Sequence, residues 1–166
     1  MSRNLSDNAR RAAFAQQTDV AFIILITITH PDLSDTIRLC NDPLMDLPSA
    51  GVKGVVSRGE EFVYLPFNFV LPKSDETGIA KAKLSIDNID RSMVVAVRTA
   101  TSSLRVLVEV ILSNDPNNVE IALPDFQLDS ATYDAFTISG DLSMEYYDLE
   151  PFPKDRFTPS QFPGLF

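Results

Sequence analysis

Apolar and polar residues alternate with a period of two along much of this chain, which is the pattern of strands that bury one face. The first such stretch, Val20–His30, contains the apolar run Ala21–Thr29, whose threonines at 27 and 29 alternate with Ile26 and Ile28. It is too short to cross a bilayer, because a transmembrane helix needs about 20 apolar residues, and we expect a strand. The turn signal Pro31–Asp35 then predicts a hairpin with residues Thr36–Asn41, in which Ile37 and Leu39 share a face.

The same alternation predicts further strands between turn signals. It is most regular where Leu104, Val106 and Val108 share one face and Arg105 and Glu109 lie on the other, and we expect this strand to be central. The strands predicted after the hairpin are Glu61–Phe67, Gly78–Asp87, Leu104–Leu112, Val119–Leu123 and Ala135–Tyr146.

Proline and glycine mark the predicted interruptions of these strands. Pro66 cannot donate a ladder hydrogen bond and therefore lies at an edge or a bulge, and Gly140 allows a bulge in the last strand. Residues Asp42–Glu60 contain several prolines and glycines with few large apolar groups, so we expect a long loop and a candidate assembly loop there. The run Asn114–Asn118 predicts a turn.

Two segments favour a helix. From Ser6 to Gln17, Ser6 can cap the first turn, and Ala9, Ala13 and Phe14 form a small apolar face. A helix of about three turns is marginal alone, so it packs either on its own sheet or on a neighbouring chain. Residues Asn88–Arg98 also favour a helix, although their valines tolerate a strand.

These elements predict a mainly β chain with one or two short helices, in the α+β class. Strands in meander order without alternating βαβ units favour an antiparallel β-sandwich or a partial barrel. The length of 166 residues fits one compact domain, which we assign to residues 1–150, followed by an extended arm at residues 151–166.

The composition excludes several classes of function. There are 14 Lys and Arg residues against 23 Asp and Glu residues, and the net charge of −9 argues against specific nucleic-acid binding and against an anionic membrane surface. A single cysteine, Cys40, excludes an internal disulfide framework. Together with the single histidine, His30, it leaves a structural zinc site without enough ligands. We therefore expect no metal and no cofactor.

The histidine and the cysteine favour structural roles. His30 follows a strand and is accompanied by no Gly-x-Ser-x-Gly motif, so we interpret it as a surface histidine rather than a catalytic base. Cys40 has no resolving cysteine. It either lies near the end of its strand or points to the face opposite Ile37 and Leu39. We expect a half-buried, inert thiol.

Charged side chains along the strands are interpreted as capping groups and as solvated or inter-subunit surface. The acids are Glu60, Glu61, Asp87 and Asp90, and the bases are Lys81, Lys83, Arg98 and Arg105. No aromatic residues interleave the bases as in a groove for single-stranded nucleic acid, and no glycine loop has phosphate-binding spacing. We therefore assign no catalytic site and no enzymatic activity to the chain.

The segment 151–166 holds four of the eleven prolines and four of the eleven phenylalanines. Neither a helix nor a central strand forms there, because proline lacks the backbone donor. Disordered tails are poor in aromatic residues, so we interpret the segment as an arm that docks, either on its own domain or on a neighbouring subunit. A disordered segment is the third and weaker alternative. The residues assigned to this assembly arm are Phe152, Phe157, Phe162, Pro163, Leu165 and Phe166.

The second half of the chain carries a run of motifs that together point to one family. They are AKLSIDNIDR at Ala82–Arg91, VE at Val119–Glu120, YDAFTISG at Tyr133–Gly140, EPFP at Glu150–Pro153 and FPGLF at Phe162–Phe166. Through these motifs the sequence resembles, over roughly residues 18–166, a domain-of-unknown-function family of tailed-bacteriophage proteins encoded among tail genes.

The resemblance implies a structural virion protein, made in the host cytoplasm and located at the tip of a long non-contractile tail. Such a protein is a distal tail or baseplate hub subunit with a tail-tube type β-sandwich and a flanking helix. It would form a homo-oligomeric ring of three or six copies and contact the tail tube, other baseplate proteins and the central fibre. An acidic lumen would let DNA pass without binding it, and no membrane is involved.

Other classes of function stay open. One is a tail-assembly chaperone that is absent from the virion. Another is a glycan-binding module that uses Tyr146, Tyr147 and Phe152 as a platform. A third is a small cell-wall hydrolase, which would need a nucleophile and a base in one cleft.

Overall fold

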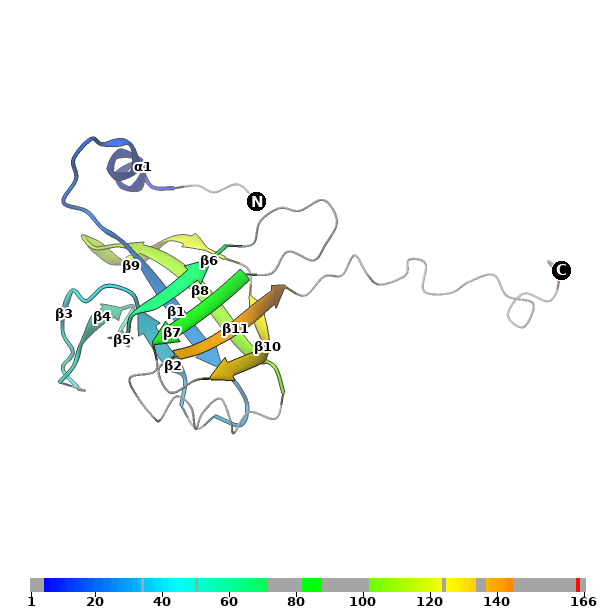
Figure 1. Cartoon of the computed structure of the whole chain (residues 1–166). Helices are drawn as coiled ribbons and strands as arrows, with labels where there is room; N and C mark the ends of the chain where they lie inside the picture. The colour runs from blue at the N-terminus through cyan, green and yellow to red at the C-terminus, as the bar shows by residue number, and fades with distance from the viewer. Residues whose placement is uncertain are drawn as a thin grey trace.

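The computed structural model of the chain describes residues 5–33, 35–49, 51–71, 82–87, 102–123, 125–133 and 137–144, together with Gly164. Within these residues the protein is mainly β, with one short helix, and the sheet curls into a half-barrel (Figure 1). The predicted β-rich α+β class is therefore confirmed, and the partial barrel describes the architecture.

The elements follow one another along the chain as one helix and then strands. They are α1 (Asp7–Phe14), β1 (Phe22–Thr29), β2 (Ile37–Cys40), β3 (Met45–Asp46), β4 (Lys53–Ser57), β5 (Glu60–Tyr64), β6 (Phe67–Val70), β7 (Ala82–Asp87), β8 (Leu104–Leu112), β9 (Asp115–Ala122), β10 (Phe126–Tyr133) and β11 (Thr137–Met144).

The strands form one sheet of 11 strands in the order β3-β4-β5-β2-β1-β8-β10-β11-β7-β6, with β9 paired to β8 outside this path. All pairs are antiparallel except β2 with β5. One edge of β8 pairs with β1 along its length, whereas the other edge is shared between β10 near Leu104 and β9 near Leu112. The strand β8 is thus the branch point of the sheet, and the prediction that it is central is confirmed.

Two apolar clusters cover opposite faces of the central strands. Ile26 and Ile28 of β1 belong to a larger cluster that also takes in β7, β8, β10 and β11. Ile23 and Leu25, which alternate with them, belong to a smaller cluster with residues of β2, β4, β5 and β8. Because successive side chains of a strand point to opposite faces, β1 is buried on both sides.

The predicted hairpin is present. Ile26 pairs with Leu39 and Ile28 with Ile37 in β1 and β2. Leu39 faces the larger cluster together with Ile37, and Cys40 at the strand end faces the smaller one, as predicted.

The N-terminal helix is shorter than predicted and uses a different face. It spans Asp7–Phe14, and the hydroxyl of its N-cap Ser6 accepts a hydrogen bond from the backbone N–H of Ala9. Ala9 and Ala12 are buried, whereas Phe14 is 88% exposed, so the expected contribution of Phe14 to the packed face is wrong. The backbone N–H and the hydroxyl of Ser6 donate to the Glu120 carboxylate of β9 at 2.8 and 2.6 Å, which ties the helix to its own sheet.

The prediction of a long loop at Asp42–Glu60 is wrong. This stretch contains β3 and β4, and β4 pairs with β5. Gly54 lies inside β4, and only glycine fits at this position because a Cβ would stand 2.1 Å from the carbonyl oxygen of Phe62. The glycine that suggests a loop in the sequence is therefore required by close packing of two strands.

Three further features of the strands differ from the prediction: a turn, a strand and the position of a bulge. The turn between β8 and β9 is at residues 113–114, and the register of β9 shifts between Asp115 and Val119, so that Asn114–Asn118 is largely an irregular strand. The strand β10 is absent from the prediction. The bulge lies in β10 between Leu128 and Ser130, whereas Gly140 pairs regularly with Leu84 and Ala131.

Two other predictions have a simple outcome. Pro66 lies at the break between β5 and β6, as expected for a residue that cannot donate. The predicted helix Asn88–Arg98 lies outside the described residues.

The tip of the β4–β5 hairpin is held against β8 and β9. Arg58 and Gly59 form the turn, with φ of 53° and 82°, which is the pattern of a type I′ hairpin. The Arg58 guanidinium binds both carboxylate oxygens of Glu109 at 2.9 and 2.5 Å, and its backbone N–H donates to Asn117 at 2.7 Å. The Ser57 hydroxyl donates to the Pro116 carbonyl at 2.6 Å. These contacts close the hairpin over the smaller cluster.

Glu109, which the alternation places on the face of Arg105 and opposite Val106 and Val108, is only 6% exposed. Its carboxylate raises the pKa of Arg58 above the usual value of that guanidinium through the direct hydrogen bonds. A buried carboxylate is tolerated here because a cation compensates it at hydrogen-bond distance.

The substitution Arg58→Ala tests this closure. It leaves the backbone strain unchanged, since alanine is strained at positive φ as well, but it leaves the buried Glu109 without its cation. We expect the free energy of unfolding to fall by about 2 kcal/mol, which is less than the usual cost of breaking a buried pair because 43% of the Arg58 side chain is exposed and water partly replaces it.

Urea denaturation followed by circular dichroism measures the change. Arg105→Ala, an exposed arginine on the same strand as Glu109, is the matched control and should cost less than about 0.5 kcal/mol. Equal stability losses for the two variants would contradict a role of the Arg58–Glu109 pair in holding the hairpin.

Candidate functional site

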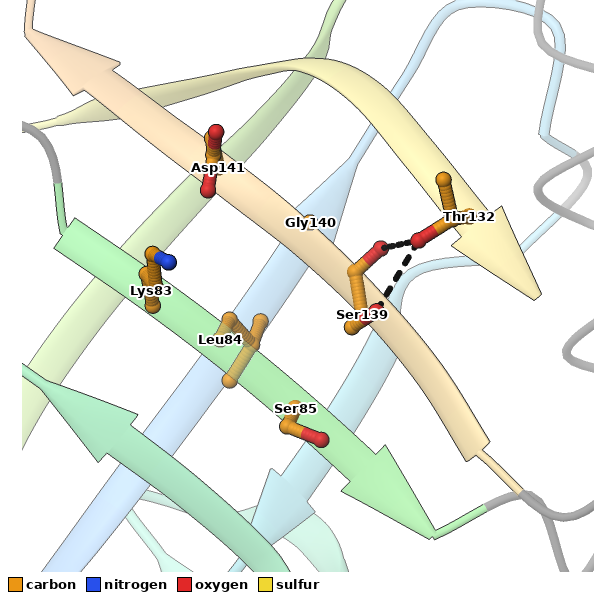
Figure 2. A pocket seen from close by; sticks show the side chains of 7 residues that line it. All are labelled: Lys83, Leu84, Ser85, Thr132, Ser139, Gly140 and Asp141. Atoms are coloured by element: carbon orange, nitrogen blue, oxygen red, sulfur yellow. Dashed lines mark hydrogen bonds between the residues drawn. The ribbon is translucent and has the colours of Figure 1, made fainter. Parts of the chain in front are cut away.

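A shallow groove of about 230 Å³ crosses β7, β11 and β10 (Figure 2). Leu84, whose side chain faces the larger cluster, marks the inner side of β7 here. Its neighbours Lys83 and Ser85 therefore point to the outer face, where they line the groove.

Hydroxyl and amide side chains form a row across four strands at this place. Asn68 of β6 pairs in register with Ser85 of β7, Ser85 pairs with Ser139 of β11, and Ser139 pairs with Thr132 of β10. The Thr132 hydroxyl contacts the Ser139 hydroxyl at 2.9 Å and donates to its carbonyl at 3.2 Å (Figure 2). Neighbouring strands are about 4.8 Å apart, so the row presents evenly spaced polar groups.

A cation and a carboxylate stand beside this row. Lys83 and Asp141 are direct cross-strand partners, and both are exposed. No ion pair joins these two described side chains, so both charges are open to solvent. The groove offers the means to bind a polar ligand, and neither an imidazole nor a thiol is among the described residues that line it.

The structure corrects the placement of His30. Only 1% of its side chain is exposed, so it is not a surface histidine. Its Nε2 lies 2.8 Å from the Ser102 hydroxyl, and its Nδ1 accepts a hydrogen bond from the backbone N–H of Asp32 at 3.0 Å. The fold thus brings a serine to this histidine over 72 positions of sequence.

The hydrogen bonds of His30 oppose a role as general base toward Ser102. Because Nδ1 accepts from the Asp32 backbone, the ring proton is on Nε2, which donates to the Ser102 hydroxyl. A nucleophile-activating histidine has the reverse arrangement, with Nδ1–H donating to a carboxylate and Nε2 accepting from the serine. The Asp32 carboxylate is 3.7 Å from Nδ1. His30 therefore fixes the turn after β1 to the start of β8.

The candidate acids are dispersed rather than gathered in a site. Glu60 forms an ion pair with Arg38 at 2.9 Å, and Glu61 accepts a hydrogen bond from the Ser49 hydroxyl. Asp87 lies at the end of β7. Asp90, Lys81 and Arg98 lie outside the described residues, as do the assembly-arm residues Phe152, Phe157, Phe162, Pro163, Leu165 and Phe166, and with them the platform residues Tyr146 and Tyr147.

Sequence reasoning missed the acids that the fold uses most. Glu120 binds the helix N-cap and Glu109 binds the hairpin turn, and each interacts with a residue more than 50 positions away. Glu120 alternates with the apolar Val119 and Ile121, which in the sequence predicts only an outward-facing strand position.

Cys40 is more deeply buried than expected. It is completely enclosed, and its thiol donates a weak hydrogen bond to the Phe62 carbonyl at 3.5 Å. Burial raises its pKa from the usual 9.0 to about 11. We expect a thiol that is protonated and enclosed at neutral pH to be unreactive, and the inert role of Cys40 stays a prediction.

The fold and the groove define a β-rich domain with a polar outer face. The chain matches the family described as "Domain of unknown function (DUF1833)" over residues 8–157 and belongs to that family. A comparison with curated proteins finds no match.

Two further observations concern the described part of the chain. Its one helix, α1, is far too short to cross a membrane, and no helix among these residues qualifies as a span. No group of three or more His, Cys, Asp or Glu side chains in the described ranges could hold a metal ion.

The burial of Cys40 predicts a pH dependence of stability. Its folded-state pKa lies above the unfolded value, so the native state binds the proton more tightly. The resulting stabilisation is complete below pH 9.0 and is lost as the pH rises toward about 11. Between these values we expect the free energy of unfolding to fall more steeply in the natural protein than in Cys40→Ala, by up to about 1.4 kcal/mol per pH unit.

Urea titrations of both proteins at several pH values measure the two slopes. Tyrosines and lysines titrate in both proteins, so only their difference reports the thiol. A thiol reagent at pH 8 should modify Cys40 only after unfolding; modification of the native protein at the rate of a free thiol would contradict the burial.

Proposed function

We propose that this protein is a structural subunit of the tip of a long non-contractile bacteriophage tail. It would act as a distal tail or baseplate hub protein in a ring of three or six copies, between the tail tube and the proteins of the baseplate and central fibre. The motifs at Ala82–Arg91 and Phe162–Phe166 supply the phage context, and the fold supports a role in assembly.

The observation that carries the assembly role is the pair of apolar ends of the sheet. At the β3 end, Leu44, Met45 and Val52 are exposed by 38, 46 and 42%. At the β6 end, Val70 and Leu71 are exposed by 47 and 53%. Large exposed apolar side chains that gather in patches mark interaction surfaces.

Two different apolar ends suit a head-to-tail ring. A cyclic interface joins one surface of a subunit to a different surface of the next, whereas a two-fold dimer joins identical surfaces. Because the chain has more acidic than basic residues, a ring lumen formed by this protein would repel DNA phosphates and let the duplex pass.

The arrangement around His30 weakens the hydrolase alternative. The serine and the histidine that the fold brings together are held in the tautomer that cannot activate the hydroxyl. A cell-wall hydrolase is therefore the weaker alternative, and turnover of peptidoglycan by the purified protein would replace the present proposal.

The first test is composition of the particle. Mass spectrometry of virions purified from the encoding phage should detect the protein in a fixed copy number per tail, and imaging of the tail tip should give its ring symmetry. Absence from mature particles would instead identify an assembly chaperone.

A second test removes residues 151–166. We expect the truncated domain to fold, because both apolar clusters lie within residues 23–142, and its thermal transition should shift by only a few degrees. Phages that encode the truncated protein should produce tails that stall or lack tip proteins. Normal particle assembly would contradict the docking role of the segment.

A further inference from the structure

The strand β6 ends the sheet and has a free edge. The Asp87 backbone N–H donates to the Pro66 carbonyl at 3.1 Å, so residues 66, 68 and 70 direct their backbone groups toward β7. Phe67 and Phe69 alternate with them and direct their N–H and C=O groups away from β7. Among the described residues, no backbone hydrogen bond engages the groups of Phe67 or Phe69 on that side.

This edge carries few of the features that protect an edge strand from pairing with another chain. Natural edge strands are protected by charges, prolines, bulges or a covering element, or by being very short. The strand β6 is short, with four residues, but it keeps two outward-facing residues, and the backbone of Pro66 before it faces β7. The stretch 65–72, LPFNFVLP, holds no charged residue, and the β6–β7 register has no shift. The other end of the sheet differs, because β3 has two residues, of which Asp46 is charged. The edge of β6 is therefore the better acceptor for an added strand.

The segment 151–166 has the proline spacing of a strand that pairs on one side only. Its prolines are at positions 151, 153, 159 and 163, which are all odd. In an extended chain, alternate residues direct their backbone groups to the same edge. All even positions therefore keep N–H donors along one edge, including Arg156, Thr158, Ser160 and Phe162, while the prolines fall on the other edge.

The side chains of this segment match the edge of β6 when the pairing is antiparallel. In that orientation the even residues share a face with Phe67 and Phe69, which pack against the larger apolar cluster. Phe162 would then lie on the core side, beside those phenylalanines. Neither residues 157–166 nor the stretch 65–72 contain a charged side chain.

The charge balance favours docking of this segment on the body of a copy of the chain, and the length of the chain allows that copy to be a neighbour. Residues 151–166 carry two bases and one acid, a net +1, whereas the rest of the chain carries 12 bases and 22 acids, a net −10. Within one copy, β6 lies two strands from β11, or about 10 Å away. Residues 145–156 can span about 40 Å when extended, which is several times that gap.

We propose that β6 binds residues 156–162 of a second copy of this chain as an added antiparallel strand. This proposal rests on the proposed function for the presence of neighbouring copies, and it names the surface that receives the assembly arm. In a ring, each copy would give its segment to one neighbour and receive the segment of the other, which covers the apolar β6 end.

Two proline substitutions in the full-length protein test whether the even-numbered residues of the segment, rather than the odd-numbered ones, pair with β6. Ser160→Pro places a proline on the pairing edge and should weaken self-association at least tenfold. Gln161→Pro places it on the odd positions, where no N–H is used, and should change self-association less than about twofold. Sedimentation equilibrium or light scattering over a concentration series measures both, and equal effects of the two substitutions would overturn the proposal.

A second pair of variants tests the acceptor strand. Leu71 follows β6 and is 53% exposed, and if the alternation of β6 continues its N–H is on the free edge. Leu71→Pro would then remove a donor of that edge, whereas Leu71→Thr keeps it. Only Leu71→Pro should reduce association strongly. Thermal denaturation of both variants shows whether the domain remains folded; loss of folding in Leu71→Pro leaves the Ser160 and Gln161 variants as the deciding measurement.

Hydrogen exchange identifies the source of the added strand. In the natural protein, the amides of Phe67 and Phe69 should become protected as the concentration rises and the oligomer forms, and Ser160→Pro should remove that protection. Protection in a monomer at low concentration would assign the strand to the same copy and overturn docking between copies. A monomer at all concentrations with both amides unprotected would overturn the proposal as well, whatever the protein's place in the virion.

Discussion

The burial of β1 on both faces is the constraint on which the rest of the structure depends. Ile23 and Leu25 on one side and Ile26 and Ile28 on the other are all at most 4% exposed. A flat sheet with one covered face would leave half of them in water, at roughly 1.5 to 3 kcal/mol for each large side chain. The sheet therefore has to supply cover twice. The curl through β10, β11, β7 and β6 encloses the larger cluster, and the β4–β5 hairpin covers the smaller one.

This double cover explains where the polar interior groups are. The hairpin reaches the far side of the sheet only if its tip is held there, and the pair Arg58 and Glu109 holds it together with the Ser57 hydroxyl. The same strand β9 that accepts the hairpin also carries Glu120, which holds α1. Strands farther from β1 need cover on one face only. Their outer faces are free to be polar, which is why the groove with Lys83 and Asp141 lies on β7 and β11.

The parts of the fold that the sequence predicts well are those with an unbroken period of two. The hairpin of β1 and β2, the strand β8 and the alternating strand β7 were correctly predicted for this reason. The strand β10 was missed because only Phe126 and Leu128 mark its alternation before the register shifts. The β3–β4 region was mistaken for a loop because a glycine inside a strand and a glycine in a turn are identical in sequence. The environments of His30 and Glu109 depend on partners 72 and 51 positions away, and local patterns carry no information about such partners.

The use of the buried polar groups also bears on the kind of function this fold can serve. His30, Ser57, Glu109 and Glu120 are the buried polar and charged residues among those described, and each is engaged by a named internal partner. A catalytic centre needs at least some such groups directed at a substrate, at the expense of stability. Here they join the helix, the hairpin and the turn after β1 to the sheet. Among the described residues, the groups without an internal partner include the outward backbone groups of Phe67 and Phe69, the charges of Lys83 and Asp141 in the groove, and the exposed apolar side chains at the ends of the sheet. Directional backbone groups beside apolar side chains are suited to binding an extended chain, which supports the proposed role in assembly.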